Sequence, residues 1–99
     1  MYMVRTVMNC RPGKVGEVLG KFKSLSGVLE EQGQAPFRLY TDVAGEPFWT
    51  LVAEREYETM NSMQEEQEKF MADERAQAAM AGYHDLVISG RREIYKVES

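Results

Sequence analysis

One side chain in this sequence stands out as suited to acid–base chemistry, the single histidine His84. Its ordinary pKa lies near neutrality, so it can take up and release a proton under physiological conditions. In a pocket between helices and a sheet it would serve as a general base or as a haem ligand. A histidine near the end of a helix also has a structural explanation, because the helix dipole stabilises its charged form there. The sequence leaves both interpretations of His84 open.

A second group of side chains would suit the lining of a pocket with polar and aromatic walls. The candidate ligand-binding residues are Asn9, Arg38, Tyr40, Trp49 and Met63. Each of them also has a structural alternative. Asn9 could hydrogen-bond its own turn, and Trp49 could belong to the core or to a subunit interface. Arg38 and Tyr40 could face solvent on a strand, and Met63 could fill the core.

Other familiar arrangements of catalytic or binding residues are absent from the sequence. With one histidine and one cysteine, Cys10, the chain has neither a second histidine nor a cysteine pair for a zinc site. It also has no glycine-rich phosphate loop and no Gly-x-Ser-x-Gly nucleophile motif. Cys10 ends a predicted strand, and we expect it to be structural. We therefore predict no metal site and no cofactor.

The composition predicts a small cytoplasmic protein that does not bind nucleic acid. The 99 residues carry a net charge of -4, and the lysines and arginines are scattered. Nucleic-acid-binding surfaces are usually basic and clustered. A single cysteine cannot form an internal disulfide, which fits a reducing compartment. We expect no signal peptide and no membrane helix, which would need ~20 apolar residues, and one domain over residues 1–99.

The first half of the chain has the pattern of a strand followed by an amphipathic helix. Residues 2–10 alternate as in a strand, with apolar side chains on both faces. Pro12 suits the first turn of a helix, where its missing N–H costs nothing. Apolar residues then recur at three- and four-residue steps over residues 15–29, and Gly33 is a suitable C-terminal cap.

The second half has the pattern of a hairpin, a broken helix and a last strand. Residues 36–42 and 47–55 predict the hairpin, with a turn around Gly45. The apolar stripe of the following helix rotates beyond residue 75, so we predict a break near Ala72-Asp73-Glu74, with Asp73 as a cap. Its first stripe places Met60, Met63, Phe70 and Met71 on one face. Past Gly90, residues 91–97 predict the last strand.

This order of elements predicts an α+β ferredoxin-like β-α-β-β-α-β sandwich, a four-stranded antiparallel sheet with the split second helix and the first helix on one face. The strands are apolar on both faces, and two helices can cover only one of them. The most economical cover for the other face is a second copy related by a two-fold axis. The sequence therefore predicts a homodimer through the sheet face.

The arrangement resembles the dimeric α/β-barrel superfamily, in which two ferredoxin-like sheets pack face to face. Within it the chain is most similar to the NIPSNAP-like and antibiotic-biosynthesis-monooxygenase-like branches. The resemblance covers nearly the whole chain and consists of architectural features. These are Arg11-Pro12-Gly13-Lys14 at the strand-to-helix turn, the split at Ala72-Asp73-Glu74, and the ending Gly90-Arg91-Arg92-Glu93-Ile94-Tyr95.

The resemblance implies two chemistries. Haem-degrading members use a strand asparagine, a tryptophan on the second helix and a histidine that binds iron. His84 lies in a comparable region, but Asn9 is at a strand end and Trp49 is on a predicted strand, so we expect no haem. Cofactor-free monooxygenases of this architecture oxidise aromatic polyketides in an apolar pocket, and no residue here excludes that reaction.

Two hypotheses for the function follow. In the first, a homodimeric α/β barrel holds a small apolar or aromatic ligand between sheet and helices as a cofactor-independent oxygenase. His84 would then be the acid or base, and Trp49 and Tyr40 would line the pocket. In the second, the protein is a non-enzymatic binding or assembly module. A histidine inside a closed cavity favours the first hypothesis, and an exposed histidine above a filled core favours the second.

Overall fold

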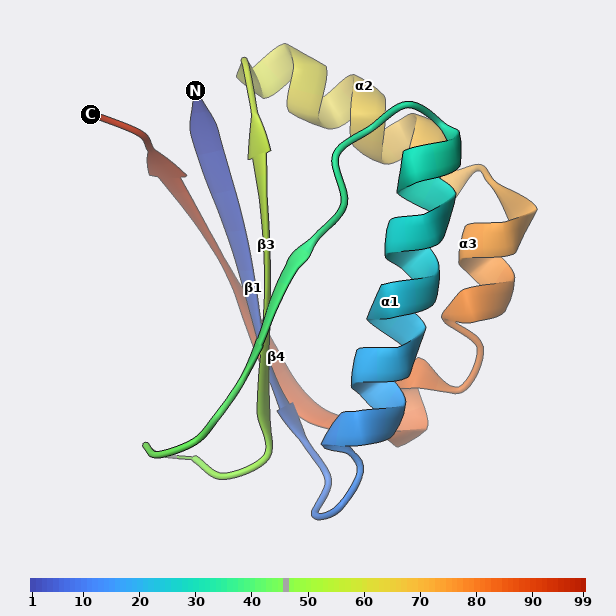
Figure 1. Ribbon diagram of the computed structural model, residues 1–99, viewed down its shortest axis with the longest axis vertical. Helices are drawn as coiled ribbons and strands as arrows, with labels where there is room; N and C mark the ends of the chain where they lie inside the picture. Colours follow the sequence, from blue (N-terminus) through green and yellow to red (C-terminus); the bar gives the residue numbers. More distant parts are fainter. Residues whose placement is uncertain (46) are drawn as a thin grey trace.

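A computed structural model describes residues 1–45 and 47–99, and in this part of the chain a four-stranded sheet packs against the helices (Figure 1). The elements are β1 (Tyr2–Cys10), α1 (Val15–Glu31), β2 (Arg38–Thr41), β3 (Thr50–Tyr57), α2 (Met60–Met71), α3 (Glu74–Ala79), the 3-10 turn η1 (Tyr83–Asp85) and β4 (Val87–Lys96). The strand order is β2-β3-β1-β4, and neighbouring strands are antiparallel. The predicted ferredoxin-like fold is confirmed.

The helices lie on one face of the sheet, and the opposite face of this chain is open (Figure 1). Alternation along β1 sets which side chains meet the helices. Val4, Met8 and Cys10 are buried on the helical side, whereas Arg5 and Val7 point to the open face and are half-buried. The two faces of the sheet therefore differ, because β1 presents buried apolar side chains to the helices and a charged side chain to the open face.

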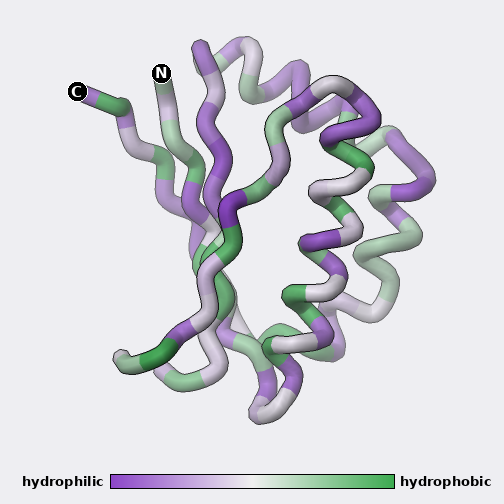
Figure 2. Tube along the Cα trace, viewed as in Figure 1, coloured by the Kyte–Doolittle hydropathy of each residue, from purple (hydrophilic) through white to green (hydrophobic). Residues whose placement is uncertain are grey.

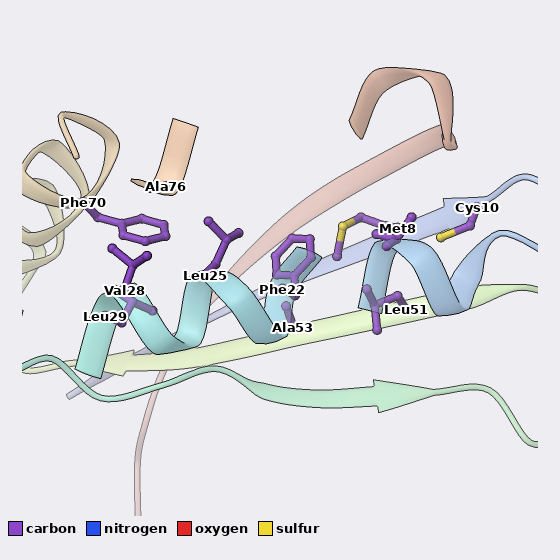
Figure 3. Packing of buried hydrophobic residues seen from close by; sticks show 11 residues of the cluster. Met8, Cys10, Phe22, Leu25, Val28, Leu29, Leu51, Ala53, Phe70 and Ala76 are labelled. Atoms are coloured by element: carbon purple, nitrogen blue, oxygen red, sulfur yellow. The ribbon is translucent and has the colours of Figure 1, made fainter. Parts of the chain in front are cut away.

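An apolar cluster between the sheet and the helices forms the core (Figures 2 and 3). Its buried members are Met8, Cys10, Val18, Phe22, Leu25, Val28, Leu29, Leu51, Ala53, Phe70 and Ala76. Phe37, just before β2, packs edge-on against Phe22 of α1, with ring centroids 5.3 Å apart, and against Phe70 of α2 at 6.4 Å. These aromatic contacts connect both helices to the start of the hairpin.

Arg55 is a charged residue buried at the edge of this core, with 6% of its surface exposed. Its Nε donates to the carbonyl oxygen of Ala35 at 3.0 Å, and its Nη1 donates to the hydroxyl of Tyr57 at 2.8 Å. The guanidinium carbon also lies 4.7 Å from the centre of the Tyr57 ring. These contacts fasten the connection between α1 and β2 onto β3.

Two glycines account for differences between the predicted and observed ends of elements. Helix α1 begins at Val15, after the predicted Pro12, because Gly13 has a φ of 77° that a right-handed helix does not accommodate. Strand β4 begins at Val87, before the predicted residue 91, and contains Gly90. A Cβ atom at Gly90 would lie 3.3 Å from the carbonyl oxygen of Val7, so glycine here permits a close approach of the two strands.

The other predicted boundaries fit more closely. Gly33 follows the end of α1 with a φ of 75°, as expected of a glycine after a helix. The observed strands of the hairpin differ from the predicted ones by two or three residues at three of their four ends. The predicted turn includes Glu46, which lies outside the described residues. The predicted break in the second helix is confirmed, because α2 ends at Met71 and α3 begins at Glu74.

The predicted apolar face of α2 is correct only in part. Phe70 is buried and Met63 is half-buried, but Met60 and Met71 are exposed, the latter by 61%. Helix α2 lies at one end of the sheet (Figure 1), so only part of the predicted apolar face is covered.

Asp73 holds the break between α2 and α3 and connects it to α1. Its Oδ1 accepts a hydrogen bond from the backbone N–H of Arg75 at 2.9 Å, as an N-cap does. Its Oδ2 accepts from Nε2 of Gln32, after the end of α1, at 3.0 Å.

We expect Asp73→Ala to lower the free energy of unfolding by about 1 kcal/mol, because it removes the cap. Asp73→Asn retains an oxygen for the cap and should cost less. Urea unfolding followed by circular dichroism measures both values. The exposed neighbour Glu74→Ala serves as the control, and equal losses for Asp73→Ala and Glu74→Ala would contradict the assigned role.

Candidate functional site

A groove of about 580 Å³ lies between the first turns of α1 and the β2–β3 hairpin. Figure 1 shows the start of α1 and the hairpin loop at the same end of the sheet. The lining residues are Val15, Gly16 and Leu19 of α1, Thr41 and Asp42 at the end of β2, and Phe48 and Trp49 before β3. The volume is in the range of small-molecule sites, and the lining is mostly apolar.

Trp49 has an unusual backbone conformation at the mouth of this groove. Its φ is 63°, in the left-handed region that favours glycine. Such a conformation costs about 1–3 kcal/mol and persists only when the surrounding structure imposes it. Here the carbonyl oxygen of Trp49 accepts a hydrogen bond from the backbone N–H of Cys10 at 2.9 Å. This bond holds the residue against the end of β1.

Two polar side chains hold the same part of the hairpin in place. The Nδ2 atom of Asn9 donates to the carbonyl oxygen of Phe48 at 2.9 Å. The Oδ1 atom of Asp42 accepts from the backbone N–H of Thr50 at 2.8 Å. The two aromatic residues of the groove are therefore flanked by hydrogen bonds from β1 and from the end of β2.

Cys10 lies beside the groove but does not have the properties of a nucleophile. It is buried, and burial raises the pKa of its thiol. The negative charge of Asp42 raises that pKa further. Both effects favour the neutral thiol, and the thiolate is the reactive form. The structure is consistent with the expected structural role of Cys10.

A second hollow, of about 610 Å³, lies on the open face of the sheet. Its lining consists of Arg5, Val7, Tyr40, Pro47, Thr50, Val52, Glu54, Arg91 and Glu93. Arg5 Nε lies 2.7 Å from Glu54 Oε2, and Arg5 Nη1 lies 3.7 Å from Glu93 Oε1. Glu93 in turn pairs with Arg91 at 3.1 Å. Glu54, Arg5 and Glu93 therefore form a row of alternating charges across β3, β1 and β4, and Arg91 extends it along β4.

This charged row corrects one expectation from the sequence. The strands were expected to be apolar on both faces, but the open face combines Val7 and Val52 with charged side chains. The hydrogen bond to Glu54 and the nearby carboxylates raise the pKa of Arg5. The hydrogen bond from Arg91 lowers the pKa of Glu93. Both pKa shifts favour the charged forms of the side chains, so the charges of the row stabilise one another.

The structure separates the residues that the sequence grouped into one pocket. Trp49 lines the groove, whereas Tyr40 lines the hollow on the open face. Arg38 lies two residues earlier on the same strand, with its guanidinium 6.0 Å from the Tyr40 ring. Asn9 supports the hairpin backbone, and Met63 is half-buried in α2.

His84 lies in η1 and is exposed to solvent. Its ring contacts the edge of Tyr83, with centroids 5.4 Å apart. It is not among the described residues that line the groove or the open-face hollow. Its predicted catalytic role therefore has no support from the geometry of either hollow.

Sequence reasoning missed six of the residues that line the groove. They are Val15, Gly16, Leu19, Thr41, Asp42 and Phe48. The α1 residues have the pattern of an ordinary amphipathic helix, so the sequence does not mark them as binding residues. The pair Phe48 and Trp49 could have been recognised, because two large aromatic residues beside a turn are difficult to bury.

The described residues show no group of three or more histidine, cysteine and acidic side chains that could hold a metal ion. In the same residues, no helix has the length and apolarity needed to cross a bilayer.

No family model and no curated protein matches the chain. Solved structures do match. An uncharacterised NIPSNAP domain protein from Burkholderia xenovorans is 17% identical, with a TM-score of 0.81 over 100% of this chain and 96% of that one. A NIPSNAP family protein of unknown function from Agrobacterium tumefaciens is 15% identical, with a TM-score of 0.82 over 98% and 87%. The chain has the NIPSNAP fold.

The same fold extends to proteins named for a reaction. A candidate antibiotic biosynthesis monooxygenase from Nitrosomonas europaea is 13% identical, with a TM-score of 0.74 over 98% of both chains. The two branches that the sequence resembles are thus both found among its structural neighbours. At these identities the likeness is one of fold.

The conformation of Trp49 can be tested by comparing two variants that both lack the indole. At a φ of 63°, the Cβ atom of alanine destabilises the folded protein by about 1 kcal/mol, and glycine has no Cβ atom. We therefore expect Trp49→Gly to be more stable than Trp49→Ala by about 1 kcal/mol in urea unfolding. At the neighbouring Phe48, which lacks a positive φ, alanine should be the more stable of the two. The same order at both positions would contradict the left-handed conformation.

Proposed function

We propose that this protein is a homodimeric α/β barrel that binds a small apolar or aromatic molecule in the groove between α1 and the β2–β3 hairpin. The observation that carries the proposal is the groove itself, whose lining combines two aromatic side chains with apolar residues of α1. Phe48 is 72% exposed and Trp49 is 40% exposed, which is costly for side chains that have no partner. A ligand in the groove would cover both.

The open face of the sheet supports the dimer. Val7 and Val52 provide an apolar centre, and two carboxylates and two guanidinium groups surround it, from Glu54, Arg5, Glu93 and Arg91. Because this face carries charges of both signs beside an apolar centre, a second copy can place its carboxylates against the guanidinium groups of the first.

We expect light scattering at micromolar concentration to give a mass of two chains. Val52→Asp should shift the protein toward the monomer, because it introduces a charge at the centre of the open face. Ser24→Asp adds the same charge on the exposed side of α1 and should leave the dimer intact. A mass of one chain for the unmodified protein would refute the dimer.

The groove can be tested with its own fluorophore, because Trp49 is the only tryptophan in the sequence. We expect benzyl alcohol, a neutral aromatic probe, to change the fluorescence of Trp49 with a saturable titration. Gly16→Leu should weaken binding by about tenfold or more, since a leucine side chain would occupy the space of the ligand.

Gly20→Leu provides a matched control on the same helix. Gly20 is exposed, has open space around its Cα, and is not among the described residues that line the groove. Both substitutions raise helix propensity equally. Equal effects of the two variants on the titration would refute binding in the groove.

Binding without catalysis is favoured over an oxygenase by the exposed position of His84. The oxygenase remains the second candidate because of the structural likeness to the Nitrosomonas europaea protein. It requires oxygen consumption with an electron-rich aromatic such as 1-naphthol, lost in His84→Ala. Under the binding proposal, an oxygen electrode registers no protein-dependent consumption, and His84→Ala titrates like the unmodified protein.

A further inference from the structure

We infer that the ligand of the groove is an organic cation, with an ammonium group on an apolar or aromatic body. This inference rests on the proposed binding function and specifies the class of molecule bound. It follows from the combination of one carboxylate with two aromatic side chains in a lining that is otherwise uncharged.

The charge of the groove comes from Asp42. Among the described residues that line it, Asp42 is the only charged one, and none is a lysine or arginine. The Oδ1 atom of Asp42 accepts a hydrogen bond from the backbone N–H of Thr50, which orients the carboxylate, and among the described residues none is hydrogen-bonded to Oδ2. The negative charge of Asp42 also raises the pKa of the neighbouring Cys10 thiol, after the larger effect of burial.

The aromatic walls have the same preference for positive charge. The faces of tryptophan and phenylalanine rings attract cations through their quadrupole, and tryptophan does so most strongly. The hydrogen bond from Cys10 fixes the backbone from which the indole of Trp49 extends. Preorganisation of this kind lowers the entropic cost of binding.

Other classes of ligand fit the groove less well. A purely apolar molecule would cover the carboxylate of Asp42 without providing a donor, and such a loss is costly. An anion would be repelled both by Asp42 and by the net charge of -4. An ammonium group beside Asp42, with its hydrocarbon part along Val15 and Leu19, gives the carboxylate a partner of opposite charge and the two side chains of α1 an apolar surface.

Three small probes that share a benzyl group but differ in charge test the inference. They are benzyltrimethylammonium, benzyl alcohol and phenylacetate. All three absorb at shorter wavelengths than those that selectively excite tryptophan, so the fluorescence of Trp49 can be followed directly. We expect the cation to bind about tenfold more tightly than the alcohol and the anion to bind more weakly than both. Added salt should reduce the advantage of the cation.

Two variants assign this advantage to its sources. Asp42→Asn retains an oxygen for the N–H of Thr50 but removes the charge, so the cation should lose about fivefold in affinity while benzyl alcohol is unaffected. Phe48→Leu retains an apolar side chain but removes a ring, and it should also act mainly on the cation. Asp85→Asn removes an exposed carboxylate elsewhere on the surface and serves as the control.

The outcomes separate this inference from the function on which it rests. Equal affinities for the cation and the alcohol would overturn the inference and leave the groove as a site for neutral aromatics. An equal loss for all probes in Asp42→Asn would overturn it as well, because Asp42 would then act only on the hairpin. No response to any probe would refute both the groove and the inference.

Discussion

The side chains of the central strand β1 face two different environments, the buried core and the open face of the sheet, and the rest of the structure depends on this constraint. One set of alternating side chains, including Met8 and Cys10, is buried beneath the helices. The other set includes Arg5, which holds the row of charges on the open face. A strand of this kind cannot shift by one residue without moving charges into the core. Its register therefore determines where the hairpin begins, and with it the position of the groove.

The groove depends on the strained conformation of Trp49. The end of β1 provides both supporting hydrogen bonds, from the backbone of Cys10 to Trp49 and from the side chain of Asn9 to Phe48. Strain that is maintained by specific contacts is a recurring property of ligand-binding positions. Here the residue with the strained backbone is Trp49, and the free-energy cost of its conformation is part of the cost of folding.

Much of the fold could be predicted because it follows from local periodicity. The alternation of residues 2–10, the apolar stripe of α1 and the break in the second helix at Asp73 all depend on neighbours in the sequence. The site was harder to predict because it depends on contacts between distant segments. Tyr40 and Trp49 are close in the sequence, but the geometry of the hairpin directs them to opposite faces of the sheet. Asp42 acquires its role only once Thr50 and Cys10 are beside it.

The buried guanidinium of Arg55 has a mechanical consequence for the hairpin. It fastens the incoming connection at Ala35 to β3, at the end of the strand remote from Trp49. The other end is held by Asn9 and by the backbone of Cys10, and β3 pairs with β1 along its whole length. The hairpin therefore forms a rigid wall, and a bound molecule must match the width that the folded chain leaves between this wall and α1.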